Sequence, residues 1–156
     1  MARYQLMGAK GDLDDIEALL QRLSVLPGET LVLRARRIMG KQHVESAVMH
    51  AQRAFERGIQ SAHSLGVETM LYLSGERQIS RAISELGLQE GDEEFAVITF
   101  GAEAETVIAS MGWIRDDSVL DLNREKRIRI HRNEAIDGLP AEGLALERVA
   151  LLDINR

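Results

Sequence analysis

The chain has 156 residues, 45% of them hydrophobic, which is enough for one sizeable core, so we predict a single domain over residues 1–156. Its formal net charge of −6 argues against a protein that coats nucleic acid along its whole surface, since such binding neutralises many phosphates with Lys and Arg. The lack of cysteine excludes disulfides, thiolate nucleophiles and thiolate metal sites. No apolar run approaches the roughly 20 residues of a membrane span and the first residues lack a signal-peptide pattern, so we expect a cytoplasmic protein with no membrane partner.

The N-terminal part predicts a strand, a helix and a second strand. Residues 4–7 are apolar and strand-like, and the two glycines within 8–11 predict a turn out of that strand. Asp12 is the expected N-cap of the helix that follows. Residues 30–33 are a β-rich run that predicts the second strand. The expected buried stripe of the helix is Leu13, Ile16, Leu19, Leu20 and Leu23.

Two helices are predicted next. Residues 41–57 carry apolar side chains at helical spacing, and Gly58 is expected to close this helix. Residues 67–73 are too continuously apolar for periodicity to distinguish a helix from a strand, and we interpret them as a helix. The expected buried face of the first helix is Val44, Ala47, Val48, Ala51 and Phe55.

A polar break over residues 74–78 separates this apolar run from another helix. Ser74 is the expected N-cap of that helix and Gly87 its stop. The apolar positions of the helix are spaced i, i+3, i+4 and i+7, which predicts one buried face. From spacing alone the break is a corner between helices, and Ile79 is expected in the core. The apolar positions are Ile79, Ala82, Ile83 and Leu86.

The C-terminal half begins with the clearest strand of the chain. Residues 95–100 are apolar on both faces, which predicts a central strand. A helix ending at Gly112 is expected to follow, then a charged segment over residues 123–133 and a last helix starting near Gly138. The expected stripe of the last helix is Ala145, Val149 and Leu152.

No catalytic centre emerges from the residue types. His43 and His50 are seven residues apart, which is about 10 Å along a helix and too far for one metal ion. Asp116 and Asp117 offer adjacent carboxylates for a magnesium ion, although such pairs are more often a helix cap with an exposed neighbour. No phosphate-binding glycine loop and no serine nucleophile elbow is present. We therefore expect a protein that is not an enzyme and holds no cofactor.

Three ordered motifs resemble one known family. They are Lys41-Gln42-His43-Val44 followed by Ala47, then Ser74-Gly75-Glu76-Arg77-Gln78-Ile79 followed by Ala82-Ile83, and Asp116-Asp117-Ser118-Val119-Leu120 followed by Asn123. The chain resembles the smallest accessory subunit of the KEOPS complex, whose family includes the kinase-binding partner of a small kinase-like ATPase. The resemblance implies a compact α/β protein of archaeal or eukaryotic cytosol with helices around a small central sheet.

The resemblance also implies a function. The family is a non-catalytic subunit that binds and stimulates the kinase-like ATPase, indirectly serves the threonylcarbamoyl-transferring subunit, and recruits tRNA through its 3′ CCA end. By position match, the implied tRNA-binding residues are Lys41, His43, Ser74, Arg77, Gln78 and Ile79. The alternative for His43 is that it caps or closes the start of its helix. A basic extension of that surface is a hypothesis from charge alone, and it involves Arg34, Arg36 and Arg37.

Several alternatives stay open. The runner-up function is a structural adaptor of the kinase-like protein without RNA binding, and a third is a small-molecule sensor domain. We expect the kinase-like partner to bind an apolar surface formed by Leu151, Leu152 and Ile154. These apolar residues occupy more positions than one buried stripe of a helix needs. The alternative is that all three pack inside.

Overall fold

The computed structural model describes residues 3–133, which contain six α-helices and a four-stranded sheet. This confirms the α/β class. The described residues divide into two compact units, the first made of residues 3–36 and 87–120 and the second of residues 37–86 and 121–133. The single domain predicted from chain length stays a prediction.

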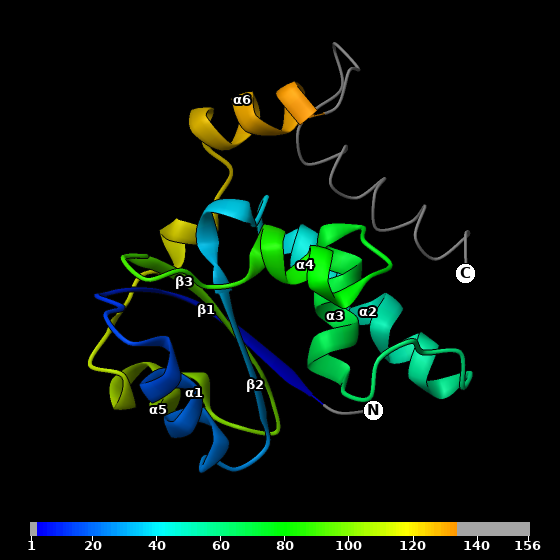
Figure 1. The fold of residues 1–156 in the computed structure, drawn as a ribbon, viewed down its shortest axis with the longest axis horizontal. Coiled ribbons are helices and arrows are strands. Elements are labelled where there is room, and N and C mark those ends of the chain that lie inside the picture. The colour runs from blue at the N-terminus through cyan, green and yellow to red at the C-terminus, as the bar shows by residue number, and fades with distance from the viewer. Residues whose placement is uncertain (1–2, 134–156) are drawn as a thin grey trace. The chain divides into compact units, whose positions relative to one another are not determined.

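The first unit contains the whole sheet (Figure 1). The strands lie in the order β2-β3-β1-β4, and every neighbouring pair is antiparallel. With one helix after β1 and another after β3, this is the βαββαβ connectivity of ferredoxin-like folds. Residues 35–93 are inserted between its second and third strands. The elements are β1 (Tyr4–Lys10), α1 (Ile16–Ser24), β2 (Glu29–Arg34), β3 (Glu94–Phe100), α5 (Ala104–Ser110) and β4 (Ile114–Arg115).

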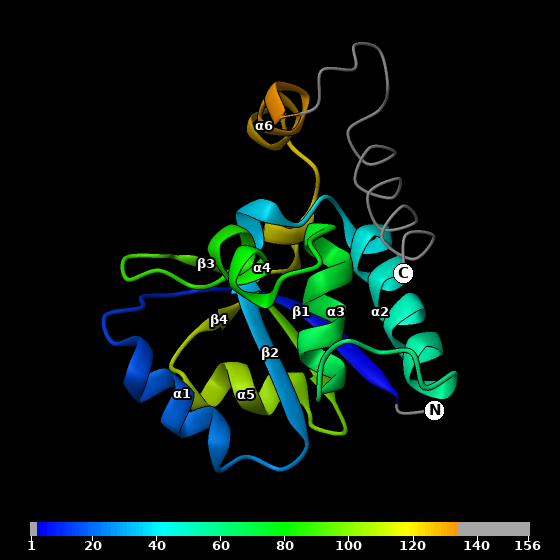
Figure 2. The ribbon, with the colours of Figure 1, turned by 45° about the vertical axis from the view of Figure 1, so that its right-hand side comes forward.

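Helices α1 and α5 cover the same face of this sheet (Figure 2). On the packed face, Trp113 stacks on Phe95 with ring centroids 3.9 Å apart and planes 5° from parallel. The Trp113 indole N–H also donates to the carbonyl oxygen of Asp12 at 3.0 Å, so the buried ring leaves no unsatisfied donor. Fully buried members of this core include Ala9, Val97, Ala104 and Val107.

Strand β3 is central, as its apolar sequence predicted, because it pairs with β1 on one side and β2 on the other. Strand β1 is longer than predicted, since it continues through Gly8 to Lys10 instead of turning. A Cβ atom at Gly8 would lie 2.3 Å from the carbonyl oxygen of Asp116, so glycine is needed for close approach of a neighbouring segment. Gly8, which predicted a turn, is therefore required by tertiary packing inside a strand.

Helix α1 also begins later than predicted. Its N-cap is Asp15, whose carboxylate accepts a hydrogen bond from the Ala18 amide at 3.2 Å, and Asp12 lies before the helix. Only part of the expected stripe is buried, and burial does not follow the bounds of the helix, since Leu13 is buried although it precedes the helix. Leu19 is buried, whereas Leu20 is 56% exposed.

The second unit is helical in its described part. Helix α2 packs against α3, and α3 packs against α4. The helices predicted at residues 41–57 and 67–73 are both confirmed. The charged segment that the sequence left unassigned is also a helix, and Asn123 caps it by accepting a hydrogen bond from the Lys126 amide at 2.8 Å. The helices are α2 (Lys41–Glu56), α3 (Leu65–Ser74), α4 (Ile79–Leu86) and α6 (Arg124–Asn133).

The last predicted helix, with Ala145, Val149 and Leu152, lies outside the described residues. Within residues 3–133, no helix is both long enough and apolar enough to cross a lipid bilayer.

Candidate functional site

The polar break after α3 is a helix end, and Ser74 is its last helical residue. Gly75 follows in the left-handed conformation with φ of 71°, and its N–H donates to the carbonyl of Tyr72 at 3.2 Å. The N–H of Glu76 reaches the carbonyl of Leu71 at 3.2 Å, which completes a Schellman motif. The glycine therefore ends one helix, and the prediction that Ser74 begins the next one was wrong.

Ser74 is fully buried at this helix end. Its hydroxyl donates to the carbonyl of Leu71 at 3.1 Å and accepts a hydrogen bond from the Glu76 amide at 3.2 Å. The hydroxyl therefore uses both its donor and its acceptor capacity on backbone groups at this helix end.

Helix α4 leaves part of its predicted core face on the surface. Ala82 and Leu86 are buried, but Ile79 is 43% exposed and Ile83 is 52% exposed. The expectation that Ile79 lies in the core was wrong. Spacing correctly placed these residues on one helical face, but helix α4 turns only one edge of that face inward.

His43 joins the beginning of α2 to the end of α3. Its Nδ1 accepts a hydrogen bond from the Met39 amide at 3.1 Å, and its Nε2 lies 2.9 Å from the carbonyl oxygen of Leu73. The side chain is only 3% exposed. This contact brings Lys41 and the residues after Ser74 to the same end of the second unit.

The segment before α2 is also held by α6. The Lys126 ammonium, buried to 3% exposure, donates to the carbonyl oxygen of Ile38 at 2.6 Å. Gly40 then turns the chain into α2 with φ of 93°, a conformation that favours glycine.

The predicted tRNA-binding residues therefore fall into two groups. His43 and Ser74 are buried and bonded to backbone groups, whereas the other four are exposed. The exposed group contains two cations, an amide and a branched apolar side chain at one end of the second unit. Its members are Lys41, Arg77, Gln78 and Ile79.

The partner-binding residues predicted from the sequence, Leu151, Leu152 and Ile154, lie outside the described residues. Of the basic residues predicted to extend that surface, Arg34 is 9% exposed and pairs through Nε with the Asp92 carboxylate at 3.4 Å. Arg34 and Arg36 belong to the first unit and Arg37 to the second, so the extension stays a prediction.

Helix α3 also contains a buried carboxylate that was not predicted from the sequence. Glu68, in the first turn of α3, is fully buried, and its Oε1 accepts hydrogen bonds from the amides of Ser61 and Ala62 at 3.1 Å each. The carboxylate therefore fixes the loop before α3. One acidic residue within an otherwise apolar run was the available signal for a buried hydrogen-bonded acid.

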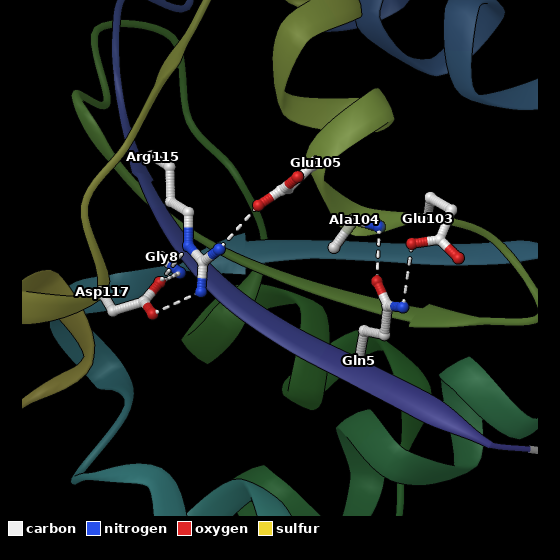
Figure 3. Close-up of polar contacts among 7 residues, drawn as sticks. All are labelled: Gln5, Gly8, Glu103, Ala104, Glu105, Arg115 and Asp117. Atoms are coloured by element: carbon white, nitrogen blue, oxygen red, sulfur yellow. Dashed lines mark hydrogen bonds and ion pairs between the residues drawn. The ribbon is translucent and has the colours of Figure 1, made fainter.

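The adjacent acids Asp116 and Asp117 serve the first unit as structural groups. Oδ1 of Asp117 accepts from the Gly8 amide at 3.0 Å, and Arg115 donates to Asp117 at 3.0 Å and to Glu105 at 2.8 Å (Figure 3). The Ser118 hydroxyl and amide, together with Lys10, hold the pKa of Asp116 below its ordinary value.

The carboxylates of Asp116 and Asp117 are thus engaged by donors from protein groups. Asp117 in turn raises the pKa of Arg115 above its ordinary value through a hydrogen bond and charge attraction. Within the described part of the chain, no group of three or more His, Cys, Asp or Glu residues is arranged for a metal ion. The helix-cap alternative fits Asp116, which accepts a hydrogen bond from the Ser118 amide at 3.0 Å at the start of a short 3-10 helix. It does not describe Asp117, which is bound by the Gly8 amide and Arg115 and is not an exposed neighbour.

The chain was compared with known protein families. A family model described as kinase binding protein CGI-121 matches residues 12–137, which include all three sequence motifs and most of both described units, although strand β1 lies before the matched range. No curated protein sequence matches the chain.

Proposed function

The chain belongs to the family of the kinase-binding protein CGI-121, and on this premise we propose that it is a non-catalytic adaptor that binds and activates a small kinase-like ATPase and brings tRNA to it. In this proposal it is the smallest subunit of the KEOPS complex, which installs threonylcarbamoyl on adenosine in tRNA. The observation that carries the RNA part is the exposed group of Lys41, Arg77, Gln78 and Ile79 at one end of the second unit.

The chemistry of this group suits a single-stranded RNA end. Arginine and lysine bind phosphate, and arginine does so with paired N–H donors. The Gln78 amide offers both a donor and an acceptor for a base edge. Ile79, at 43% exposure, provides an apolar surface against which an unstacked base packs. A tRNA 3′ CCA end provides all three partners: phosphates, base edges and unstacked bases.

Arg77→Glu tests this proposal. We expect it to weaken binding of intact tRNA by about tenfold or more, because one phosphate contact becomes a repulsion. The slope of log affinity against log salt should fall by about 0.7, the change for one lost phosphate contact on a single strand. Fluorescence anisotropy at several salt concentrations measures both quantities.

The matched control is Arg53→Glu, which makes the same charge change on an exposed residue in the last turn of α2. We expect it to change tRNA affinity by no more than about twofold, since it lies about 18 Å along the helix from Lys41. Equal losses in the two variants, or equal wild-type binding of tRNA with and without its CCA end, would contradict a CCA-binding site at this corner.

For the kinase-like partner, we propose the apolar surface of Leu151, Leu152 and Ile154. Deleting residues 152–156 should abolish co-purification with the kinase-like protein, because the deletion removes two of the three apolar side chains. Circular dichroism should show an unchanged helical spectrum. Retention of the complex by the shortened chain would refute this placement.

A second candidate function is a protein adaptor that does not bind RNA. It is favoured by the exposure of Ile79 and Ile83 on α4, because neighbouring apolar side chains on a surface are typical of protein contacts. Ile83→Asp separates the two functions. Loss of the kinase-like partner with tRNA binding intact assigns α4 to protein contact, and loss of tRNA binding alone assigns it to the RNA site.

A further inference from the structure

His43 has a fixed arrangement of its ring proton. The Met39 amide can only donate, so Nδ1 must present its lone pair, and the proton of the neutral ring then lies on Nε2 and points to the Leu73 carbonyl. The two ring nitrogens are thus both engaged by backbone groups. With 3% of its surface exposed, the ring has no face on which a base could stack.

The backbone groups that His43 joins lie next to the exposed cations in the sequence. Met39 immediately precedes Gly40 and Lys41, and Leu73 lies at the end of α3, ahead of the corner that carries Arg77. The Met39 bond is local to the start of α2. The Leu73 bond links two different helices, and therefore constrains the separation of Lys41 from Arg77.

The segment that carries Lys41 is held at two successive residues. Lys126 binds the carbonyl of Ile38 at 2.6 Å, and His43 binds the amide of Met39 at 3.1 Å. With these anchors present, the remaining freedom of Lys41 lies mainly in its own side chain. A cation held in this way loses less backbone entropy when it binds a phosphate.

We propose that His43 is a positioning residue of the RNA-binding corner: through its Nε2 bond to Leu73 it sets Lys41 against Arg77, and it does not touch the RNA. This inference rests on the proposed tRNA-binding function and deepens it by assigning a buried residue an indirect role. It differs from the role implied by the family resemblance, in which His43 is itself a tRNA-binding residue.

Two substitutions separate the bonds of the ring. The amide of Asn reaches the position of Nδ1, so His43→Asn keeps an acceptor for Met39 and loses the link to Leu73. The longer Gln reaches the position of Nε2, so His43→Gln keeps a donor for Leu73. We expect His43→Asn to weaken tRNA binding by about fivefold and His43→Gln to stay within about twofold of wild type.

A double-mutant cycle distinguishes positioning from a general loss of stability. Lys41→Ala is combined with wild type, His43→Asn and His43→Gln, and tRNA affinity is measured by anisotropy well below each melting temperature. If His43 positions Lys41, the fold loss caused by Lys41→Ala should be much smaller in the Asn background than in wild type, and should return to the wild-type value in the Gln background.

An equal Lys41→Ala loss in all backgrounds would overturn the positioning role and leave the RNA site standing. Wild-type protein that binds no tRNA would overturn both proposals. If His43→Asn does not fold, the Gln background still tests the proposal, since a Lys41→Ala loss smaller there than in wild type contradicts it.

Discussion

Glu68→Ala should lower the free energy of unfolding by about 2–4 kcal/mol, because it leaves the buried amide of Ala62 and the partly buried amide of Ser61 without their acceptor. Glu68→Gln should lower the free energy of unfolding by less. Its carbonyl oxygen can take the place of Oε1, which accepts from both amides in the native protein.

Urea unfolding followed by circular dichroism measures this loss, and Glu45→Ala on the exposed surface of α2 is the matched control, expected to change stability by less than about 0.5 kcal/mol. The chain has one tryptophan, Trp113, which lies in the first unit, whereas Glu68 lies in the second. If the predicted single domain unfolds cooperatively, Trp113 fluorescence should report the same midpoint shift as circular dichroism. Equal stability of Glu68→Ala and Glu45→Ala would contradict the assigned role of the carboxylate.

Trp113→Ala should lower the free energy of unfolding by about 3–5 kcal/mol, the range for removing a large buried aromatic ring. The change removes the stacking on Phe95 and the hydrogen bond to the Asp12 carbonyl. The ring sits among the core residues that α1 and α5 place on the sheet, so a cavity would open there. Chemical unfolding followed by circular dichroism measures the loss.

Trp113→Phe is the comparison that separates these contributions. It keeps a ring against Phe95 but has no donor for Asp12, so we expect a loss of about 1–2 kcal/mol. If the phenylalanine and alanine variants were equally unstable, the hydrogen bond and not the stacked ring would dominate.

Elements with a strong repeating pattern could be predicted from the sequence. Helix α2 was predicted at nearly its observed length, because its apolar residues recur at helical spacing over four turns. Strand β3 was predicted as central, because a strand whose successive residues are all apolar presents apolar side chains on both faces of the sheet. In both cases the local pattern and the tertiary environment agree.

The errors occurred where a local signal had two physical causes. Glycine at position 8 indicated a turn, but close approach of Asp116 requires the same residue inside a strand. Serine followed by glycine at 74–75 suggested the start of a helix, but a left-handed glycine after an apolar run also ends one. In both cases the burial of the neighbouring residues distinguishes the two causes. The periodicity of the sequence alone does not give that burial.

The candidate site was predicted in composition and only partly in geometry. Lys41, Arg77 and Gln78 are exposed, as an RNA contact requires, and the family match supports a kinase-binding role. The hydrogen-bond partners of His43 could not be predicted, because Met39 and Leu73 contribute backbone groups that any sequence supplies. Binding of tRNA stays a prediction.

The long insertion between β2 and β3 has a consequence for folding during synthesis. Strands β1 and β2 do not pair with each other, and each depends on β3, so that Tyr4 and Glu29 both align with Phe100. The ribosome must therefore release about a hundred residues before the first strand finds a partner, and the high contact order of these pairings favours slow sheet formation. Helices α2, α3 and α4 emerge before that point and can form local structure while the N-terminal strands wait, exposed to chaperones.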